Sequence, residues 1–125
     1  MVALPRISDA EWQVMNVLWG RSPLSASEVV EALAGGRRWS PRTVKTLLNR
    51  LVGKGALSFR TEGKRYLYSP AVARTDCVRK ETRSFAQRVF GGQAAPMLVH
   101  LVRSAKLSDD QIEDLKRLLD QKRGE

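Results

Sequence analysis

The spacing of apolar residues over the first 55 positions predicts three short helices. Apolar side chains recur every three or four residues in three stretches, each introduced by a serine. The three serines are Ser8, Ser25 and Ser40. The first two have a glutamate three positions later, which is the capping-box arrangement that begins a helix. Ser40 precedes a proline, which is favoured at the first helical position because it has no N–H to leave unpaired. Glycines mark the expected helix ends at Gly20, 35–36 and Gly55.

After Gly55 the pattern changes from helical to alternating. Residues 56–60 and 65–69 have the period of two that is typical of strands, and the intervening 61–64 contain Gly63, which suits a tight turn. Pro70 follows as the expected end of the hairpin. Three helices followed by a hairpin predict a winged helix-turn-helix, a mainly α fold with a small β-hairpin. Tyr66 and Tyr68 fall on one face of the hairpin, with Leu67 on the other, and we expect both tyrosines to be packing residues.

The last 55 residues predict a helical arm. Helices are expected over 75–90, over 95–105, and after Ser108, which begins a third capping box. Three helices of this size form only a thin core by themselves, so a second copy of the chain is expected to cover their apolar stripes. The alternative is that these helices fold back onto the winged domain. We therefore divide the chain into a DNA-binding domain, 1–70, and a dimerisation domain, 71–125. The expected dimer contacts are Val78, Phe85, Val89, Phe90, Met97, Leu98, Leu101, Ile112, Leu115, Leu118 and Leu119.

Composition narrows the possible functions. The chain has 125 residues, 42% of them apolar, which suits a globular protein, and no apolar run approaches the ~20 residues of a membrane span. The N-terminus lacks the features of a signal peptide, so a cytoplasmic location is expected. With one cysteine, Cys77, and one histidine, His100, neither an internal disulfide nor a metal site is expected. Because phosphate-loop and nucleophile motifs are also missing, we expect neither a cofactor nor enzymatic activity, and a small nuclease is the less favoured alternative.

The positive charge is concentrated in one segment. Residues 37–65 contain nine basic side chains and a single acid, Glu62, and so account for +8 of the net charge of +9. The basic residues are Arg37, Arg38, Arg42, Lys45, Arg50, Lys54, Arg60, Lys64 and Arg65. In contrast, residues 71–125 hold eleven basic and eight acidic side chains. Such a segment indicates a polyanion-binding module, although a merely soluble basic face has the same charge.

The third predicted helix has two distinct faces. Four apolar residues fall within an arc of about 100°. They are Val44, Leu47, Leu48 and Leu51. The remaining face combines cations, which bind phosphates, with side chains that can contact base edges. It consists of Arg42, Thr43, Lys45, Thr46, Asn49 and Arg50, with Ser40 at the helix N-terminus, where a phosphate is also favoured. This face is either a DNA-reading surface or an ordinary solvated helix face, and its place before a basic hairpin favours DNA reading.

The hairpin tip is the second candidate DNA contact. Arg60, Lys64 and Arg65 lie beside the turn and are expected to contact the DNA backbone or to enter the minor groove. The alternative is that these charges only prevent pairing at the strand edges.

Three segments resemble the penicillinase and methicillin-resistance repressors. Residues 7–19 resemble the opening of that family, 39–51 its recognition helix, and 107–115 its C-terminal dimer helix. The resemblance extends over residues 7–122. It implies a homodimeric repressor of transcription that binds palindromic operator DNA with TACA and TGTA half-sites, possible targets being β-lactam resistance genes. By position, it also implies that Arg42, Thr43, Thr46 and Arg50 face the DNA and that Ser40 lies at a phosphate.

The chain departs from the family pattern in two places. The copper-responsive branch has a cysteine-rich metal site, which Cys77 alone does not provide. In the β-lactam branch, a membrane sensor triggers proteolysis of an Asn-Phe bond in the helical arm, and the matching pair here is His100-Leu101. A sensor-protease pathway is therefore an expectation from the resemblance only, and His100 is otherwise an ordinary helix residue. A protein that coats DNA or RNA without sequence preference is the alternative function.

Overall fold

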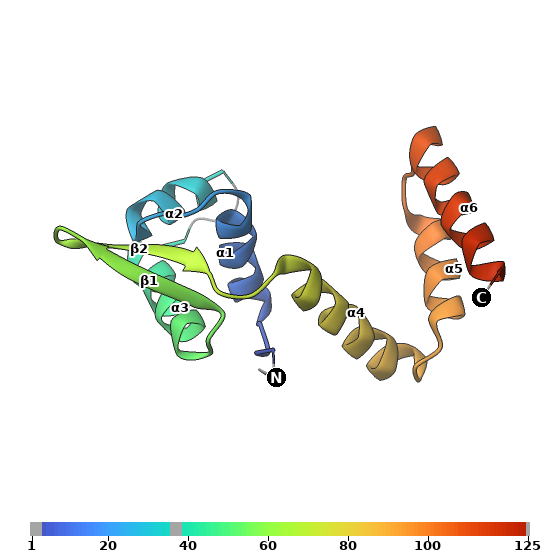
Figure 1. Cartoon of the computed structure of the whole chain (residues 1–125), viewed down its shortest axis with the longest axis horizontal. Helices are drawn as coiled ribbons and strands as arrows, with labels where there is room; N and C mark the ends of the chain where they lie inside the picture. Colours follow the sequence, from blue (N-terminus) through green and yellow to red (C-terminus); the bar gives the residue numbers. More distant parts are fainter. Residues whose placement is uncertain (1–3, 36–38, 125) are drawn as a thin grey trace. The chain divides into compact units, whose positions relative to one another are not determined.

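The computed structural model describes residues 4–35 and 39–124, which form six helices and one two-stranded sheet. Figure 1 shows the elements in chain order. The helices are α1 (Asp9–Gly20), α2 (Ala26–Leu33), α3 (Pro41–Gly53), α4 (Arg74–Phe90), α5 (Ala94–Ser104) and α6 (Asp109–Arg123). The strands are β1 (Leu57–Glu62) and β2 (Arg65–Pro70). The winged helix-turn-helix predicted from the sequence is confirmed, since three helices precede an antiparallel hairpin.

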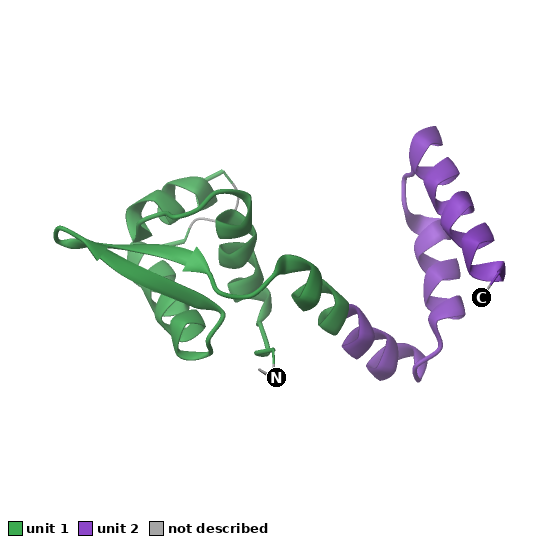
Figure 2. Ribbon diagram, viewed as in Figure 1, with its two compact units in different colours: residues 1–81 green, residues 82–125 purple. Residues whose placement is uncertain are grey.

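The chain divides into two compact units, residues 1–81 and 82–125 (Figure 2). The first unit extends beyond the boundary expected after residue 70. It does so because the segment after the hairpin packs on the first three helices: Cys77 is buried in their core, and Trp19 Nε1 donates a 3.0 Å hydrogen bond to the Val72 carbonyl. Val78, which we expected at a dimer contact, is half-buried and belongs to this first unit.

All three predicted capping boxes are present. At α1, the Ser8 hydroxyl accepts from the Glu11 N–H at 3.3 Å, and the Glu11 carboxylate accepts from the Ser8 N–H at 2.9 Å. The boxes at Ser25 and Ser108 have the same reciprocal bonds. Each box satisfies two backbone N–H groups at the start of the helix that would otherwise be left to water, so these helices begin where the sequence indicated.

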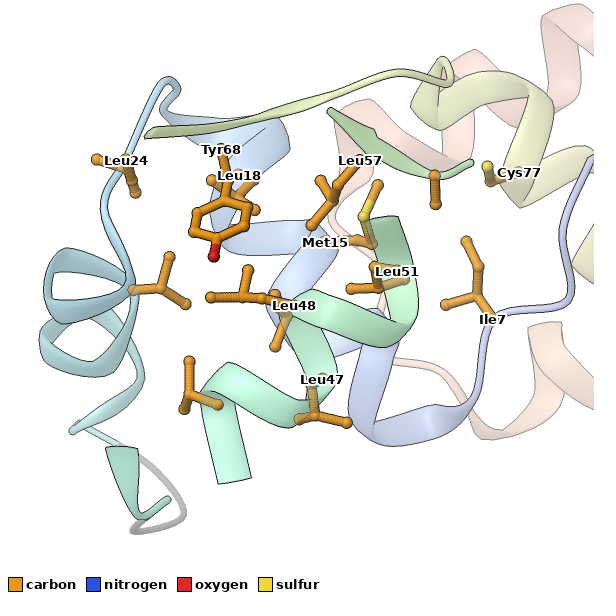
Figure 3. Packing of buried hydrophobic residues seen from close by; sticks show 14 residues of the cluster. Ile7, Met15, Leu18, Leu24, Leu47, Leu48, Leu51, Leu57, Tyr68 and Cys77 are labelled. Carbon is orange, nitrogen blue, oxygen red and sulfur yellow. The ribbon is translucent and has the colours of Figure 1, made fainter. Parts of the chain in front are cut away.

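The core of the first unit lies between α3, α1 and the hairpin. The four apolar residues of α3 are all buried, with exposed fractions between 0% and 5%. Figure 3 shows Leu48 and Leu51 of α3 in one cluster with Met15 and Leu18 of α1 and Tyr68 of β2. Burial of one aliphatic side chain contributes about 1.5–3 kcal/mol, so this stripe strongly favours one rotation of α3 about its axis.

The hairpin is tighter than the sequence suggested. Its register pairs Glu62 with Arg65, so the turn consists only of Gly63 and Lys64, and positions 61 and 62 belong to β1. Gly63 has a φ of 62°, which a non-glycine residue rarely adopts and which the first position of a type II′ turn requires. The twist of such a turn matches that of the strands, so the alternation continues closer to the turn than expected. Leu24 adds a short bridge to Tyr68, with backbone bonds of 2.8 and 3.1 Å.

The second unit leaves its apolar side chains accessible. None of the residues of α5 and α6 is buried. Leu101 is 51% exposed, and Leu118 and Leu119 are 59% and 58% exposed. Aromatic contacts join α4 to α5, since the Phe90 ring lies 5.8 Å from that of His100. The apolar side chains of α5 and α6 therefore lie at the surface of this unit and do not form a buried core.

An ion pair with a buried carboxylate joins the start of α1 to the end of α3. Lys54 Nζ lies 2.5 Å from Glu11 Oε1 and also donates to the Arg6 carbonyl at 2.7 Å. Burial raises the pKa of the Glu11 carboxyl, but the hydrogen bonds from Lys54 and Ser8 outweigh it, and the pKa lies below the ordinary value of 4.5. A carboxyl with a depressed pKa stabilises the fold above the unfolded-state pKa, and this contribution is lost as the pH falls through the folded-state value.

We predict that Glu11→Gln lowers the free energy of unfolding by about 1–2 kcal/mol at pH ~7, because the charge-assisted bonds are lost. The gap to the parent should narrow as the pH is lowered through the folded-state pKa of Glu11, which lies below 4.5, because the carboxyl itself then becomes protonated. Urea unfolding followed by tryptophan fluorescence measures this, since Trp12, Trp19 and Trp39 all belong to the first unit. Glu31→Gln, which neutralises an exposed acid on α2, is the control. A gap that does not change between neutral and acidic pH would contradict the assignment.

Candidate nucleic-acid interface

The polar face of α3 is exposed to solvent. Burial of the apolar stripe turns all six polar residues predicted to read DNA toward solvent. These are Arg42, Thr43, Lys45, Thr46, Asn49 and Arg50. Within the described residues, the side chains of Lys45, Asn49 and Arg50 form neither hydrogen bonds nor ion pairs. Cations without protein partners do not have to break an ion pair before they bind a phosphate or a base edge.

The hydroxyl groups of this region are used within the helix. Ser40 Oγ caps α3 by accepting from the Thr43 N–H at 3.1 Å, and it lies 2.8 Å from Thr43 Oγ1. Thr46 Oγ1 donates to the Arg42 carbonyl at 3.0 Å. Since its hydroxyl proton is used there, Thr46 offers mainly its methyl group to a base edge, and a thymine methyl is the matching partner.

The hairpin cations differ in their surroundings. Lys64, in the turn, has no ion-pair partner among residues 4–35 and 39–124. Arg60 and Arg65 lie 3.9 and 3.8 Å from the Glu62 carboxylate. The side chains of Arg60, Glu62 and Arg65 are each more than half exposed. Because solvent weakens ion pairs at such exposed positions, a DNA phosphate can replace the Glu62 carboxylate as the partner of either arginine.

A cleft lies between α3, the hairpin and the first turn of α2. Its volume is about 510 Å³. It brings together residues that are far apart in the sequence, with cations from both α3 and the hairpin tip. The lining consists of Ser25, Ala26, Ser27, Glu28, Lys45, Asn49, Lys64, Arg65, Tyr66 and Tyr68. Arg42, Arg50 and Arg60, although predicted as DNA contacts, do not line it.

Glu28 is the one acid in this cleft, and its charge is partly neutralised. Its Oε1 accepts from the Ser25 N–H at 3.0 Å, and its Oε2 lies 3.5 Å from Arg21. The Ser25 backbone hydrogen bond lowers the pKa of the Glu28 carboxyl most, with smaller contributions from Arg65 and Arg21. The cleft therefore contains three cations against one carboxylate that already has partners.

The sequence predicts that both hairpin tyrosines are packing residues, and the structure shows that they differ in exposure. Tyr68 is buried, with 5% exposed, whereas Tyr66 is 51% exposed and lines the cleft. The alternation placed the two on one face correctly, since both rings lie near that of Phe59, at 4.8 and 6.1 Å. Tyr66 lies closer to the turn, where the hairpin extends past the helices that cover Tyr68. No residue near Tyr66 in the sequence indicates how far the hairpin extends past these helices. Arg37 and Arg38 lie outside the described residues.

Two other features, a metal-binding cluster and a membrane-spanning helix, are absent from the described residues. In 4–35 and 39–124, no three His, Cys, Asp or Glu side chains come together as they would around a metal ion. Among the helices of these ranges, none combines the length and the apolar content that a membrane span requires.

The chain is similar to known repressors. The profile of the penicillinase repressor family matches residues 7–121. The penicillinase repressor of Bacillus licheniformis is 35% identical over 121 residues, covering 97% of this chain and 94% of that protein. The methicillin resistance regulatory protein MecI of Staphylococcus aureus is 34% identical over 116 residues, covering 93% and 94%. A solution structure of the monomeric form of Bacillus licheniformis BlaI in complex with the blaP half-operator is 42% identical, with a TM-score of 0.52, and covers 61% of this chain and 93% of that one.

Proposed function

The chain belongs to the penicillinase repressor family and is a DNA-binding transcriptional repressor, and we propose that it binds a palindromic operator as a homodimer. The half-sites proposed are of the TACA and TGTA type. The helix that reads them is α3, and the hairpin contacts the adjacent backbone. The proposal places the protein in the cytoplasm, where its DNA lies.

The observation that supports this proposal most is the outward face of α3. Within the described residues, the side chains of Lys45, Asn49 and Arg50 are exposed and have no hydrogen-bond or ion-pair partners. Burial of the apolar stripe on the opposite side of α3 keeps them directed toward solvent. Arginine can donate two hydrogen bonds to guanine, and asparagine can pair with adenine, so this face has the means to distinguish base pairs. A protein that coated DNA without sequence preference would need only cations to bind phosphates, and no side chains that match base edges.

Dimerisation through the second unit follows from its exposed apolar residues. Leu98, Leu101 and Leu115 are each between 39% and 51% exposed, although they lie on amphipathic helices. Apolar surface of this kind is usually covered by a partner. A two-fold dimer also matches the symmetry of a palindromic operator.

The route by which repression ends is a further part of the proposal. The pair at the family's cleavage position, His100-Leu101, lies within α5, where both residues are exposed. A protease would need α5 to open locally before it could reach that peptide bond. Cleavage there by a pathway that begins at a membrane sensor stays a prediction from the family.

We predict that Arg50→Ala weakens binding to the operator by ~1–3 kcal/mol, because Arg50 lies on the exposed face of α3 and can contact a base edge. Titration against duplexes that each carry one substituted base pair should show relaxed preference at one position only. If the variant loses the same affinity on every duplex, Arg50 is a phosphate contact and does not read sequence.

We also predict that Leu101→Asp or Leu115→Asp dissociates the dimer, because either places a charge in an apolar interface. Sedimentation velocity at a fixed concentration gives the mass of each variant. Gln121→Glu, which adds one negative charge to an exposed position of α6, is the matched control and should sediment as the parent. An unchanged mass for both leucine variants would exclude these positions from the interface.

A further inference from the structure

The cleft between α3 and the hairpin lies where the DNA backbone must pass if both elements bind. The strands of a duplex separate its major groove from its minor groove. If α3 occupies the major groove and the hairpin tip reaches the adjacent minor groove, one sugar-phosphate strand crosses the space between them. The cleft is this space, because Lys45 and Asn49 of α3 line one side and Lys64 and Arg65 of the hairpin line another.

Tyr66 has the surroundings of a binding residue. Tyr66 is half exposed, and its ring packs against the ring of Phe59, with 4.8 Å between the two ring centroids. Phe59 is itself 47% exposed, so the two rings form an accessible apolar surface on the hairpin face that borders the cleft. The Tyr66 hydroxyl makes no hydrogen bond within the described residues. It therefore remains available as a donor to an outside acceptor.

We propose that this cleft binds one backbone phosphate of the operator and its deoxyribose, and that Tyr66 is the residue that positions them. The Tyr66 hydroxyl donates to a phosphate oxygen, and the Tyr66 and Phe59 rings pack against the sugar. Lys45, Lys64 and Arg65 supply the opposing charge. Because every DNA sequence has the same backbone, this contact adds affinity and fixes register without reading bases. The inference rests on the proposed function, because it takes α3 as the reading helix.

The chain offers a matched pair of variants. Tyr66→Phe removes one hydroxyl and keeps the ring on Phe59. Ser58→Ala removes an exposed hydroxyl from the same hairpin, but alternation along β1 places Ser58 on the opposite face. Lys64→Ala serves as a second comparison, because it removes a charge from the cleft while Tyr66→Phe does not.

Fluorescence anisotropy with the full chain measures binding to a TACA/TGTA duplex and to a scrambled duplex over a range of salt concentrations. We expect Tyr66→Phe to weaken binding to both duplexes by at least ~3-fold, as for the loss of one ordinary hydrogen bond at a solvent-accessible site, with no change in the salt dependence. Lys64→Ala should reduce the slope of log K against log salt by about 0.9, as expected for one phosphate contact. Ser58→Ala should bind as the parent does.

Two results would overturn the assignment. If Tyr66→Phe binds both duplexes within about twofold of the parent and of Ser58→Ala, no phosphate is bound at Tyr66. If it weakens binding to the TACA/TGTA duplex alone, Tyr66 contacts a base and not the backbone. Preference of the parent for one duplex tests the proposed function separately, because the effect of Tyr66→Phe can be read on the scrambled duplex whatever that preference is.

Discussion

The burial of one face of α3 is the constraint on which the DNA-binding surface depends. Val44, Leu47, Leu48 and Leu51 pack against α1 and the hairpin, so the helix has a single favourable rotation. Turning α3 by half a turn would expose three leucines and bury Arg42, Lys45 or Arg50. Exposing each leucine costs about 1.5–3 kcal/mol, and burying an unpaired guanidinium costs more. The core therefore determines which side chains face DNA, although none of its members contacts DNA.

The described basic side chains of α3 and the hairpin differ in whether they have an acidic partner. On α3, Lys45 and Arg50 have no acid near enough to form an ion pair in the described structure. At the hairpin, Glu62 pairs with both Arg60 and Arg65. Lys54 differs again, because it is directed inward to Glu11 and stabilises the unit. The basic residues of 39–65 are thus not one uniform patch, and counting their charges overstates the number available to a phosphate.

Much of this arrangement could be predicted from the sequence because it depends on local rules. Capping boxes, a proline at N1 and the period of the apolar residues place the helices and the buried stripe of α3 within a residue or two. The features that could not be predicted depend on contacts between distant segments. Nothing near Tyr66 in the sequence reports how far the hairpin extends past the helices, so its exposure was missed. Nor does the pattern around Cys77 indicate that α4 begins inside the first unit. The pairing of Glu11 with Lys54 joins residues 43 positions apart and has no local signal either.

The central claim is that α3 reads a base sequence, and a comparison of two duplexes tests it most directly. Fluorescence anisotropy at physiological salt would compare the affinity of the purified protein for a TACA/TGTA dyad with its affinity for a scrambled duplex of equal length. The account predicts a preference for the dyad of at least ~10³-fold, the lower end for sequence-specific DNA-binding proteins. Equal affinity for the two duplexes would contradict it, and would identify the outward face of α3 as a surface that binds phosphates without regard to sequence.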